Sequence, residues 1–309
     1  MVMTSARWLV PVAYLTVYLV WGSTYLAIRF GVETMSPSLL FGCRFLLAGL
    51  INLALYRVLC GITGETPRRP SRRQVANASV IGCVLLIGGT GLVGWAEQTV
   101  DSHLAALIVS STPLWVTLFD SALRRTVPAS PPQVLGMALG VAGVAILTGA
   151  GGGPVFRPGA GVALLLLATL FWSIASSASH LADLPSNAVL TSAIQMTAAG
   201  AVFALIGAAT GDLAPASLAG ASAASWWAML YLAVFGSSVA FTAFAWLLTV
   251  EPAHRVASYA LVNPLVAVAL GAGWGHETIG PRVWLALPVL SLGLALHLFA
   301  PARILHAAR

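Results

Sequence analysis

Charged side chains are scarce in this sequence, and lysine is missing from it entirely. Only 8% of the 309 residues are charged, whereas 59% are hydrophobic, and the mean hydropathy is +0.91. A soluble domain carries about 25% charged residues because its surface must face water. A chain with a third of that supply cannot cover a globule of this size with polar groups. We therefore predict an integral membrane protein whose surrounding solvent is mostly lipid.

Cysteine is also rare, and the usual patterns of catalysis are missing. Three cysteines, an odd number, argue against a disulfide framework, and we expect them to be small apolar fillers. The chain has no H-E-x-x-H motif and no His/Asp cluster at ligand spacing, so we predict no metal and no cofactor. A serine-rich run at 173–179 has only His180 beside it and no acid to orient that histidine. A membrane-embedded enzyme is thus disfavoured, although it stays the alternative. A channel is disfavoured too, because no ring of charge or carbonyl filter motif occurs.

What the sequence does contain is a series of long apolar runs. A membrane span needs about 20 mostly apolar residues. Turn-forming and charged residues occupy the gaps between the runs. Ten windows qualify, at 8–28, 38–58, 75–95, 103–123, 132–149, 159–179, 188–209, 225–247, 254–274 and 283–300. The pattern predicts an all-α protein with ten transmembrane helices.

The distribution of the fifteen arginines predicts how these helices are oriented. With the N-terminus placed in the cytoplasm, eleven arginines fall on the inner side, three on the outer side and one, Arg44, within a span. Because cytoplasmic loops carry the excess of basic residues, we expect a multi-pass protein of the inner (plasma) membrane with both termini cytoplasmic. The net charge of +6 does not indicate nucleic-acid binding, since the arginines lie in short gaps between apolar runs.

The two halves of the chain share uncommon residues at one constant offset of 151 positions. The matched pairs are Trp21 and Trp172, Ala48-Gly49 and Ala199-Gly200, Trp95 and Trp246, His103 and His254, and Pro113-Leu114 and Pro264-Leu265. Agreement at a single offset across four spans indicates an internal duplication. We predict two repeats, 1–150 and 151–309. Each contains five spans, an odd number, so the second repeat enters the membrane from the opposite face and is inverted.

Several short motifs occur in the order typical of a known transporter family. They are W-G-S-T-Y-L-A-I-R-F-G at 21–31, P-S-L-L-F-G-C-R-F-L-L-A-G at 37–49, S-T-P-L at 111–114, V-N-P-L-V-A at 262–267 and G-H-E-T at 275–278. With the duplication, they make most of the chain resemble the EamA-type ten-helix permeases of the drug/metabolite transporter superfamily. The resemblance implies a permease that moves small organic metabolites, often outward. It also implies a central cavity between helices 1, 3, 4, 6, 8 and 9.

Aromatic residues at matched positions are candidates for the cavity wall. Trp21 and Tyr25 stand four residues apart and share one helix face, as do Trp172 and Ser176. Aromatic walls with polar tips suit amphiphilic or cationic organic solutes. The alternative is an interfacial belt, where Trp and Tyr gather at span ends. The predicted substrate-binding residues are Trp21, Tyr25, Trp95, Ser111, Thr112, Trp172, Ser176, Trp246, Tyr259 and Asn263.

Two matched prolines, Pro113 and Pro264, fall near the middle of the fourth and ninth spans. Proline removes the helical hydrogen bond to the carbonyl four residues back, which frees the carbonyls of Val109 and Ala260. A freed carbonyl in a membrane must find another donor or face a water-filled cavity. We predict two bent or broken helices that flank a midplane binding site. An ordinary packing kink is the alternative.

Ionisable groups inside the spans are few. Arg44 is the only arginine well inside a span, where a charge costs about 2.5–3.5 kcal/mol on insertion scales, and its repeat counterpart is Gln195. We predict a structural hydrogen-bonding role for both, with contact to an anionic substrate group as the alternative for Arg44. No carboxylate is predicted near a midplane, so the sequence offers no obvious carrier for proton coupling. Glu97, at the outer end of the third span, is predicted to lie in a solvated loop or at an external gate.

These patterns favour a carrier over an enzyme or a channel. An inverted duplication suits a protein that alternates between two equivalent poses around a central site. We predict that the chain moves a small organic metabolite, amino-acid-like or drug-like, by alternating access in the export direction. The partners are then the substrate and the lipid bilayer. Three glycines in the fifth span, Gly136, Gly140 and Gly143, allow either a homodimer or tight packing within a monomer.

Overall fold

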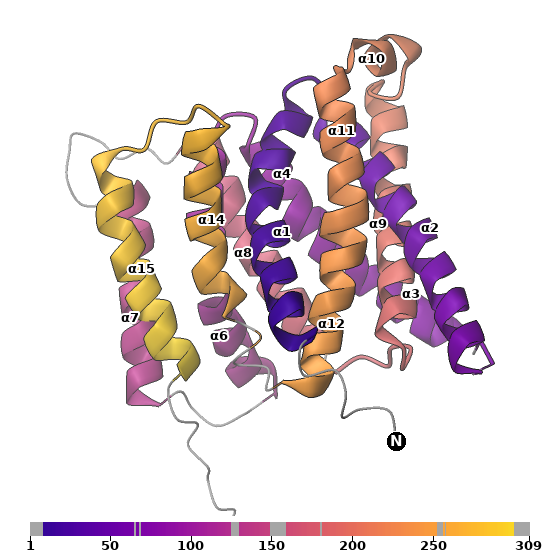
Figure 1. Ribbon diagram of the computed structural model, residues 1–309, viewed down its shortest axis with the longest axis horizontal. Coiled ribbons are helices and arrows are strands. Elements are labelled where there is room, and N and C mark those ends of the chain that lie inside the picture. The colour runs from indigo at the N-terminus through magenta and orange to yellow at the C-terminus, as the bar shows by residue number, and fades with distance from the viewer. Residues whose placement is uncertain are drawn as a thin grey trace, which may run out of the picture.

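The computed structural model describes residues 9–64, 66, 67, 69–124, 130–148, 159–179, 181–251, 256 and 258–299. Every regular element in these ranges is a helix (Figure 1). The first half holds α1 (Leu9–Val32), α2 (Pro37–Thr63), α3 (Arg72–Cys83), η1 (Val84–Gly91), α4 (Leu92–Ala96), α5 (Ser102–Val109), α6 (Thr112–Arg124) and α7 (Pro131–Thr148). The second half holds α8 (Ala160–Ser179), α9 (Ala188–Thr210), α10 (Pro215–Gly220), α11 (Ala223–Tyr231), η2 (Leu232–Val239), α12 (Ala240–Val250), α14 (Tyr259–Gly273) and α15 (Pro281–Phe299).

The helices form ten apolar runs, numbered here as spans 1 to 10 in chain order. Eight runs are long and apolar enough to cross a membrane, and the shorter apolar helices Pro131–Ile146 and Tyr259–Gly273 complete the set. The continuous run α3–η1–α4 is span 3, α5 with α6 is span 4, and α11–η2–α12 is span 8. Each run falls on a predicted window, so the prediction of an all-α membrane protein with ten helices is confirmed. The short helix α10 is an addition between spans 7 and 8.

Local signals in the sequence explain where several of these helices begin and end. Ser36 caps α2, because its side chain accepts from the backbone N–H of Leu39, and a proline follows at the first helical position. Ser71 and Gln74 form a reciprocal capping box at the start of α3. Gly64, with φ 71°, ends α2 in the left-handed region that glycine adopts without a steric penalty.

Corresponding spans of the two halves pair with each other. α2 packs along α9 at one edge of the bundle, and α7 packs along α15 at the other (Figure 1). Span 2 therefore meets span 7, and span 5 meets span 10. Other contacts come in exchanged pairs, since α1 packs on α14 just as α8 packs on α6. Contacts that survive exchange of the halves indicate an approximate two-fold axis between two repeats, as in inverted-repeat carriers.

Apolar side chains cover the outside of the bundle as well as its inside. Leu15, Ile62, Leu205 and Trp284 are 56%, 76%, 70% and 61% exposed, as expected for side chains that face lipid. The main interior cluster is built around Phe41, Phe45 and Phe203 at the contact between α2 and α9. The helices are thus held by packing of their inner faces, with an outer surface that lipid tolerates.

The glycine stripe of α7 packs within the monomer. A Cβ atom at Gly136 would lie 2.5 Å from the backbone oxygen of Gly293, and one at Gly143 would lie 2.5 Å from the side chain of Leu290. Both neighbours belong to α15. Small residues let the two backbones approach closely, which is the usual role of such stripes between membrane helices. This arrangement agrees with the monomer-packing alternative for these glycines.

Spans 3 and 8 contain a wider helical turn at corresponding places. η1 (Val84–Gly91) and η2 (Leu232–Val239) are π-helical segments flanked by α-helix on both sides. Such segments are uncommon and often occur at functional sites. Both lie in the third span of their repeat, so this part of each repeat is a candidate for the functional site.

Candidate functional site: a central cavity between the repeats

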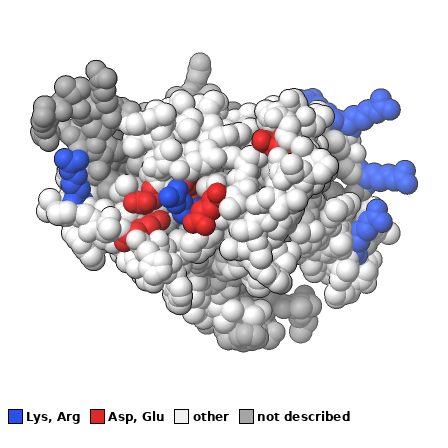
Figure 2. All heavy atoms as spheres, turned by 90° about the horizontal axis from the view of Figure 1, so that it is seen from above, with Lys and Arg blue, Asp and Glu red and all other residues white. Residues whose placement is uncertain are grey.

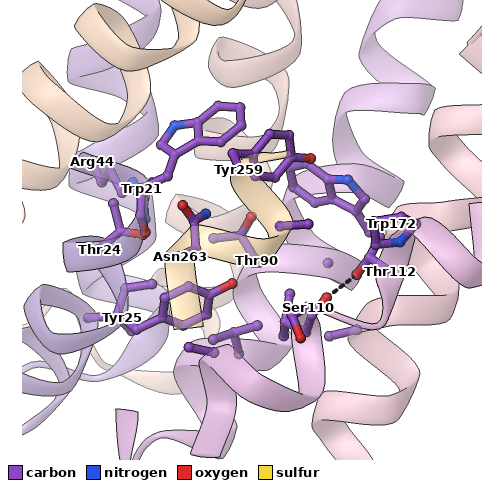
Figure 3. A pocket seen from close by; sticks show the side chains of 18 residues that line it. Trp21, Thr24, Tyr25, Arg44, Thr90, Ser110, Thr112, Trp172, Tyr259 and Asn263 are labelled. Atoms are coloured by element: carbon purple, nitrogen blue, oxygen red, sulfur yellow. Dashed lines mark hydrogen bonds between the residues drawn. The ribbon is translucent and has the colours of Figure 1, made fainter. Parts of the chain in front are cut away.

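A cavity of about 150 Å³ lies at the centre of the bundle, between the two repeats (Figure 3). Its walls come from α1, α2, η1, α4, α5, α6, α8 and α14. The lining residues are Trp21, Thr24, Tyr25, Ile28, Arg44, Gly89, Thr90, Val93, Ala106, Val109, Ser110, Thr112, Pro113, Ala168, Trp172, Tyr259, Ala260 and Asn263. Both repeats contribute, as expected for a site on the approximate two-fold axis. Spans 1, 3, 4, 6 and 9 line it as the family resemblance implies, and span 2 takes the place of span 8.

The structure brings six of the ten predicted substrate-binding residues together around this cavity. They are Trp21, Tyr25, Thr112, Trp172, Tyr259 and Asn263, and Pro113 joins them. Pro264 and four predicted residues, Trp95, Ser111, Ser176 and Trp246, are not part of the wall. Trp95 instead stacks on Phe203, with ring centroids 5.8 Å apart, and Trp246 packs in a separate apolar cluster with Val17 and Leu247. Matched positions in sequence therefore do not guarantee equal access to the cavity.

Aromatic rings from both repeats form much of the cavity wall (Figure 3). The Trp21 ring lies 5.0 Å from the Tyr259 ring in an edge-on contact, and its Nε1–H donates to the carbonyl of Gly236 at 3.1 Å. Its repeat partner Trp172 packs directly on Gly89, where an added Cβ would lie 2.8 Å from the ring. In the π-helical segment of the opposite repeat, one glycine thus accepts a hydrogen bond from Trp21 and another is packed against by Trp172. Glycine permits this close approach because it has no side chain.

Span 4 is broken where the sequence places Pro113, but span 9 is not broken at Pro264. α5 ends at Val109 and α6 begins at Thr112, with two turn residues between them. The carbonyl of Val109 accepts a hydrogen bond of 2.6 Å from the Thr112 hydroxyl. α14 runs continuously through Pro264. Of the two helices predicted to be bent or broken, span 4 is broken, whereas α14 is continuous at Pro264.

The side chains beside these prolines donate hydrogen bonds to backbone carbonyls. Ser110 and Ser111 each donate to a backbone carbonyl of their own helix at 2.7 Å, and of the two only Ser110 lines the cavity. Asn263, with its amide nitrogen facing the backbone, donates to the carbonyls of Tyr259 at 3.1 Å and Tyr18 at 3.3 Å. Asn263 thereby links α14 to α1. The residues beside the prolines place polar groups at the site, as the sequence suggests. Most of their hydrogen bonds go to backbone carbonyls.

Arg44 is the one basic side chain in the cavity wall, and it is 6% exposed. Its Nε–H donates to the Ser237 hydroxyl at 3.0 Å, and its guanidinium lies 5.0 Å from the ring centroid of Phe45. Its Nη1 has no hydrogen-bond partner among the described residues. A buried guanidinium with free donor capacity is suited to hold a carboxylate or another anionic oxygen. The structure thus shows a structural bond for Arg44 and also a donor free for a ligand.

Gln195, the repeat counterpart of Arg44, does not reach the cavity. It lies on α9 against Gly82 of α3, where an added Cβ would be 2.5 Å from the Gln195 Cα. The two-fold relation is therefore broken at the cavity, because only the first repeat supplies a charge there.

Sequence reasoning missed two polar residues of the wall. Thr24 and Thr90 both line the cavity. Thr24 stands three residues after Trp21, so the helix spacing used for Tyr25 also indicates Thr24. Thr90 lies in the run G-G-T-G at 88–91, and no periodic signal distinguishes it. Only the π-helical turn of η1 and its packing against α8 place that residue at the centre.

At one end of the bundle, Glu277 of the second repeat contacts His103 of the first. The carboxylate of Glu277, in the loop after α14, accepts from the backbone N–H groups of Ser102 at 2.7 Å and His103 at 3.2 Å. It also lies 2.6 Å from Nδ1 of His103. Burial alone would raise the pKa of Glu277, but these hydrogen bonds outweigh it and lower the pKa to about 2. Glu277 therefore caps α5, whose own N-cap residue, Asp101, makes no side-chain cap.

Comparison with known proteins identifies the architecture around this cavity. The EamA-like transporter family matches residues 8–149 and, a second time, residues 159–299. An uncharacterised inner membrane transporter of Escherichia coli (strain K12), YedA, is 37% identical over 296 residues, covering 94% of this chain and 91% of that protein. A probable terminal-alkyne amino-acid exporter of Streptantibioticus cattleyicolor is 26% identical, with 96% and 93% covered.

A solved crystal structure shares the fold as well. It superimposes with a TM-score of 0.66 at 21% identity and covers 96% of this chain and 100% of its own. The double family match agrees with the two repeats seen in sequence and in the pairing of spans. The family match covers nearly the whole chain, and we conclude that this protein belongs to the EamA-like transporter family.

Proposed function

We propose that this membrane transporter is an inner-membrane carrier that exports a small organic metabolite by alternating access. The observation that carries the proposal is the central cavity, which residues of both repeats line together. A site at the junction of two inverted repeats can open to either side when one repeat tilts against the other. A membrane-embedded enzyme stays the alternative.

The cavity favours a solute of amino-acid size over a large drug. Its volume of about 150 Å³ is below the roughly 300–1,000 Å³ typical of pockets for drug-sized ligands. Aromatic rings line much of it, hydroxyl groups lie between them, and Arg44 supplies a single positive charge. These features suit a solute with an apolar side chain and a carboxylate. One relative is described as a probable terminal-alkyne amino-acid exporter, which agrees with this chemistry.

The distribution of charge supports an orientation with both termini in the cytoplasm. Figure 2 views the bundle from above and shows acidic side chains gathered around one basic side chain near the middle of that face. The loops at this end contain Glu33, Glu97, Asp101, Asp212 and Glu277. Arg57, Arg69, Arg72 and Arg73 lie in or beside the connection between α2 and α3, toward the opposite end. Under the positive-inside rule the arginine-rich end faces the cytoplasm, and the acidic end therefore faces outward.

The first test asks which solutes bind and cross. Purified protein is heated with individual L-amino acids, and a solute that binds the native state raises the unfolding midpoint by mass action. Solutes that raise the unfolding midpoint are then tested in reconstituted vesicles. Counterflow of radiolabelled L-leucine and L-phenylalanine against these solutes measures their exchange. We expect at least one neutral amino acid to stabilise the protein and to exchange. Absence of exchange for every amino acid and for a panel of amphiphilic cations would overturn the carrier function.

The second test addresses orientation. Single cysteines are placed at Glu33 and at Arg69 in a variant that lacks Cys43, Cys60 and Cys83. A membrane-impermeant maleimide added to intact cells should label position 33 and spare position 69. The reverse labelling would invert the proposed orientation, and labelling of both from outside would contradict the assignment of these loops to opposite ends.

A further inference from the structure

Glu97 is a fully buried carboxyl group without a hydrogen-bond partner. It is 0% exposed, and neither of its carboxyl oxygens has a partner among the described residues. Glu97 directly follows α4. Its backbone N–H donates a hydrogen bond of 2.8 Å to the carbonyl of Val93, which continues the last turn of the helix. Arg29 donates to the backbone carbonyl of Glu97 and not to its carboxyl group. The prediction of a solvated loop is therefore wrong, because the neighbouring elements close over this side chain.

Charged and titratable groups on several elements face the Glu97 carboxyl. α1 contributes Tyr25 and Arg29, α2 contributes Arg44, and the loop after α14 contributes Glu277. α8 and η1 also pack against α4, and neither contains a titratable residue. Burial raises the pKa of Glu97, and the negative charge of Glu277 raises it further, whereas Arg29 and Arg44 lower it. The balance holds the pKa well above the ordinary range, so the neutral acid is favoured in this packing.

The position of Glu97 lies between the cavity and the outer surface. On the inner side, Val93, Tyr25 and Arg44 line the central cavity. On the outer side, Glu277 is bonded to His103, and His103 lines a surface depression with Asp101 and Arg282. A group that takes up a proton from one side of a membrane and releases it to the other side must be reachable from both sides. Among the acidic groups that the structure describes, Glu97 combines this position with full burial and free oxygens.

We propose that Glu97 is the proton-binding site that couples solute export to the inward movement of a proton. The inference rests on the proposed carrier function. A proton from water on the outer side adds to a carboxylate oxygen, forming one O–H bond and removing one negative charge. The outer end then closes over a neutral group, which avoids burying an unpaired charge. When the cavity opens to the cytoplasm, the O–H bond breaks and the proton passes to water. The carboxylate left behind faces Arg29 and Arg44.

The first experiment reads the proton directly. Infrared difference spectroscopy of the protein in lipid nanodiscs follows the C=O stretch of a protonated carboxylic acid between about pH 5 and about pH 8. We expect wild type to show such a band, titrating above the range of an ordinary glutamate. The band should vanish in Glu97→Gln and persist in Glu33→Gln, which removes an exposed carboxylate from the same face. A band that is missing in wild type, or that survives in Glu97→Gln, would overturn the assignment.

The second experiment separates coupling from transport itself. Vesicles are loaded with the labelled amino acid that gives counterflow in wild type, and either a pH gradient or a sodium gradient is imposed. We expect the pH gradient to drive net movement in wild type and in Glu33→Gln. Glu97→Gln, which mimics the protonated acid, should still exchange solute without a gradient, while its gradient-driven movement falls to that of protein-free vesicles.

The outcomes distinguish the two proposals. Counterflow in wild type with no response to pH, or with a response to sodium instead, overturns the role of Glu97 and leaves the carrier function intact. Loss of counterflow for all solutes in wild type overturns the carrier function. If Glu97→Gln does not fold, Glu97→Asp replaces it, and an unchanged pH dependence of its transport and of its infrared band then contradicts the proposal.

Discussion

The two repeats build one cavity but supply it with different chemistry. The first repeat contributes Trp21, Tyr25 and the charge of Arg44, together with the break between α5 and α6. The second repeat contributes Trp172 and Asn263 on helices that run without a break. Gln195, where the charge would recur, packs away from the cavity. The architecture thus follows the two-fold relation, whereas the polarity of the binding site departs from it.

This difference has a functional consequence. A cavity with equal halves would hold a solute in two equivalent orientations, but a single guanidinium defines one end of it. A solute carboxylate placed at Arg44 leaves its side chain among the rings of Trp21, Trp172 and Tyr259. Under the proposed function, the asymmetry would orient the solute, while the approximate symmetry would provide two similar open states.

The largest effect is expected for Arg44→Gln. This change gives the first repeat the residue that the second repeat has at the matched position, Gln195. A hydrogen bond to a charged group contributes about 1.5–3 kcal/mol, so affinity for a carboxylate-bearing solute should fall about 10- to 150-fold. Concentration dependence of counterflow measures the loss. Gln195→Ala is the matched control and should leave affinity unchanged, since its side chain lies against α3. Equal losses in both variants would show that the two positions act only through packing.

A smaller effect is expected for the cavity tryptophans. Trp21→Ala removes a ring of the cavity wall that also contacts Tyr259 edge-on. A contact between two aromatic rings contributes about 0.5–1.5 kcal/mol, so the affinity for an aromatic solute that stacks on Trp21 should fall about 2- to 10-fold. Trp246, although matched in sequence to another tryptophan, lies outside the wall, so Trp246→Phe should retain wild-type affinity. Labelled L-phenylalanine counterflow separates the two. A loss in Trp246→Phe with none in Trp21→Ala would move the site away from this cavity.

The π-helical glycines offer a comparison within the wall. In Gly89→Ala the new methyl group would lie 2.8 Å from the Trp172 ring, which must then shift. Overpacking of this kind costs about 1–3 kcal/mol of stability and should also narrow the site. In Gly236→Ala the nearest atom, Cγ2 of Thr24, is 3.1 Å away, so we expect a weaker effect. Thermal unfolding and counterflow should rank the variants in that order, and the opposite ranking would contradict the packing described here.

The last prediction concerns stability in acid. The pKa of Glu277 is lowered from its ordinary 4.5 to about 2 in the folded protein, so its stabilising contribution is complete above the ordinary value. That contribution is lost as the pH falls through this window toward 2. Glu277→Gln should therefore unfold at a lower temperature than wild type at neutral pH, and the difference should shrink as the pH falls through the window. A difference that is constant with pH would show that the carboxylate charge is not what stabilises the cap on α5.

Much of the architecture could be predicted because its signals are local. Ten apolar runs, the capping residues Ser36 and Ser71, and the constant offset between Trp21 and Trp172 are all visible along the chain. Side-chain placement was less predictable. Trp95 and Trp246 obey the same repeat spacing as Trp21 and Trp172, yet they pack elsewhere. In lipid, an aromatic face suits a neighbouring helix, the bilayer or a cavity almost equally well, so hydropathy cannot choose among them.

By itself, the sequence determined that this chain lies in lipid, crosses it about ten times and consists of two related halves. These properties follow from composition and from spacing, which do not depend on distant contacts. Only the tertiary structure decided that Arg44 reaches the cavity and that Glu97 is buried. Both outcomes depend on neighbours from other helices, for Arg44 on Ser237 and for Glu97 on α8 and α1, which pack against α4. The environment of a charge is set by those neighbours, and sequence position alone does not reveal them.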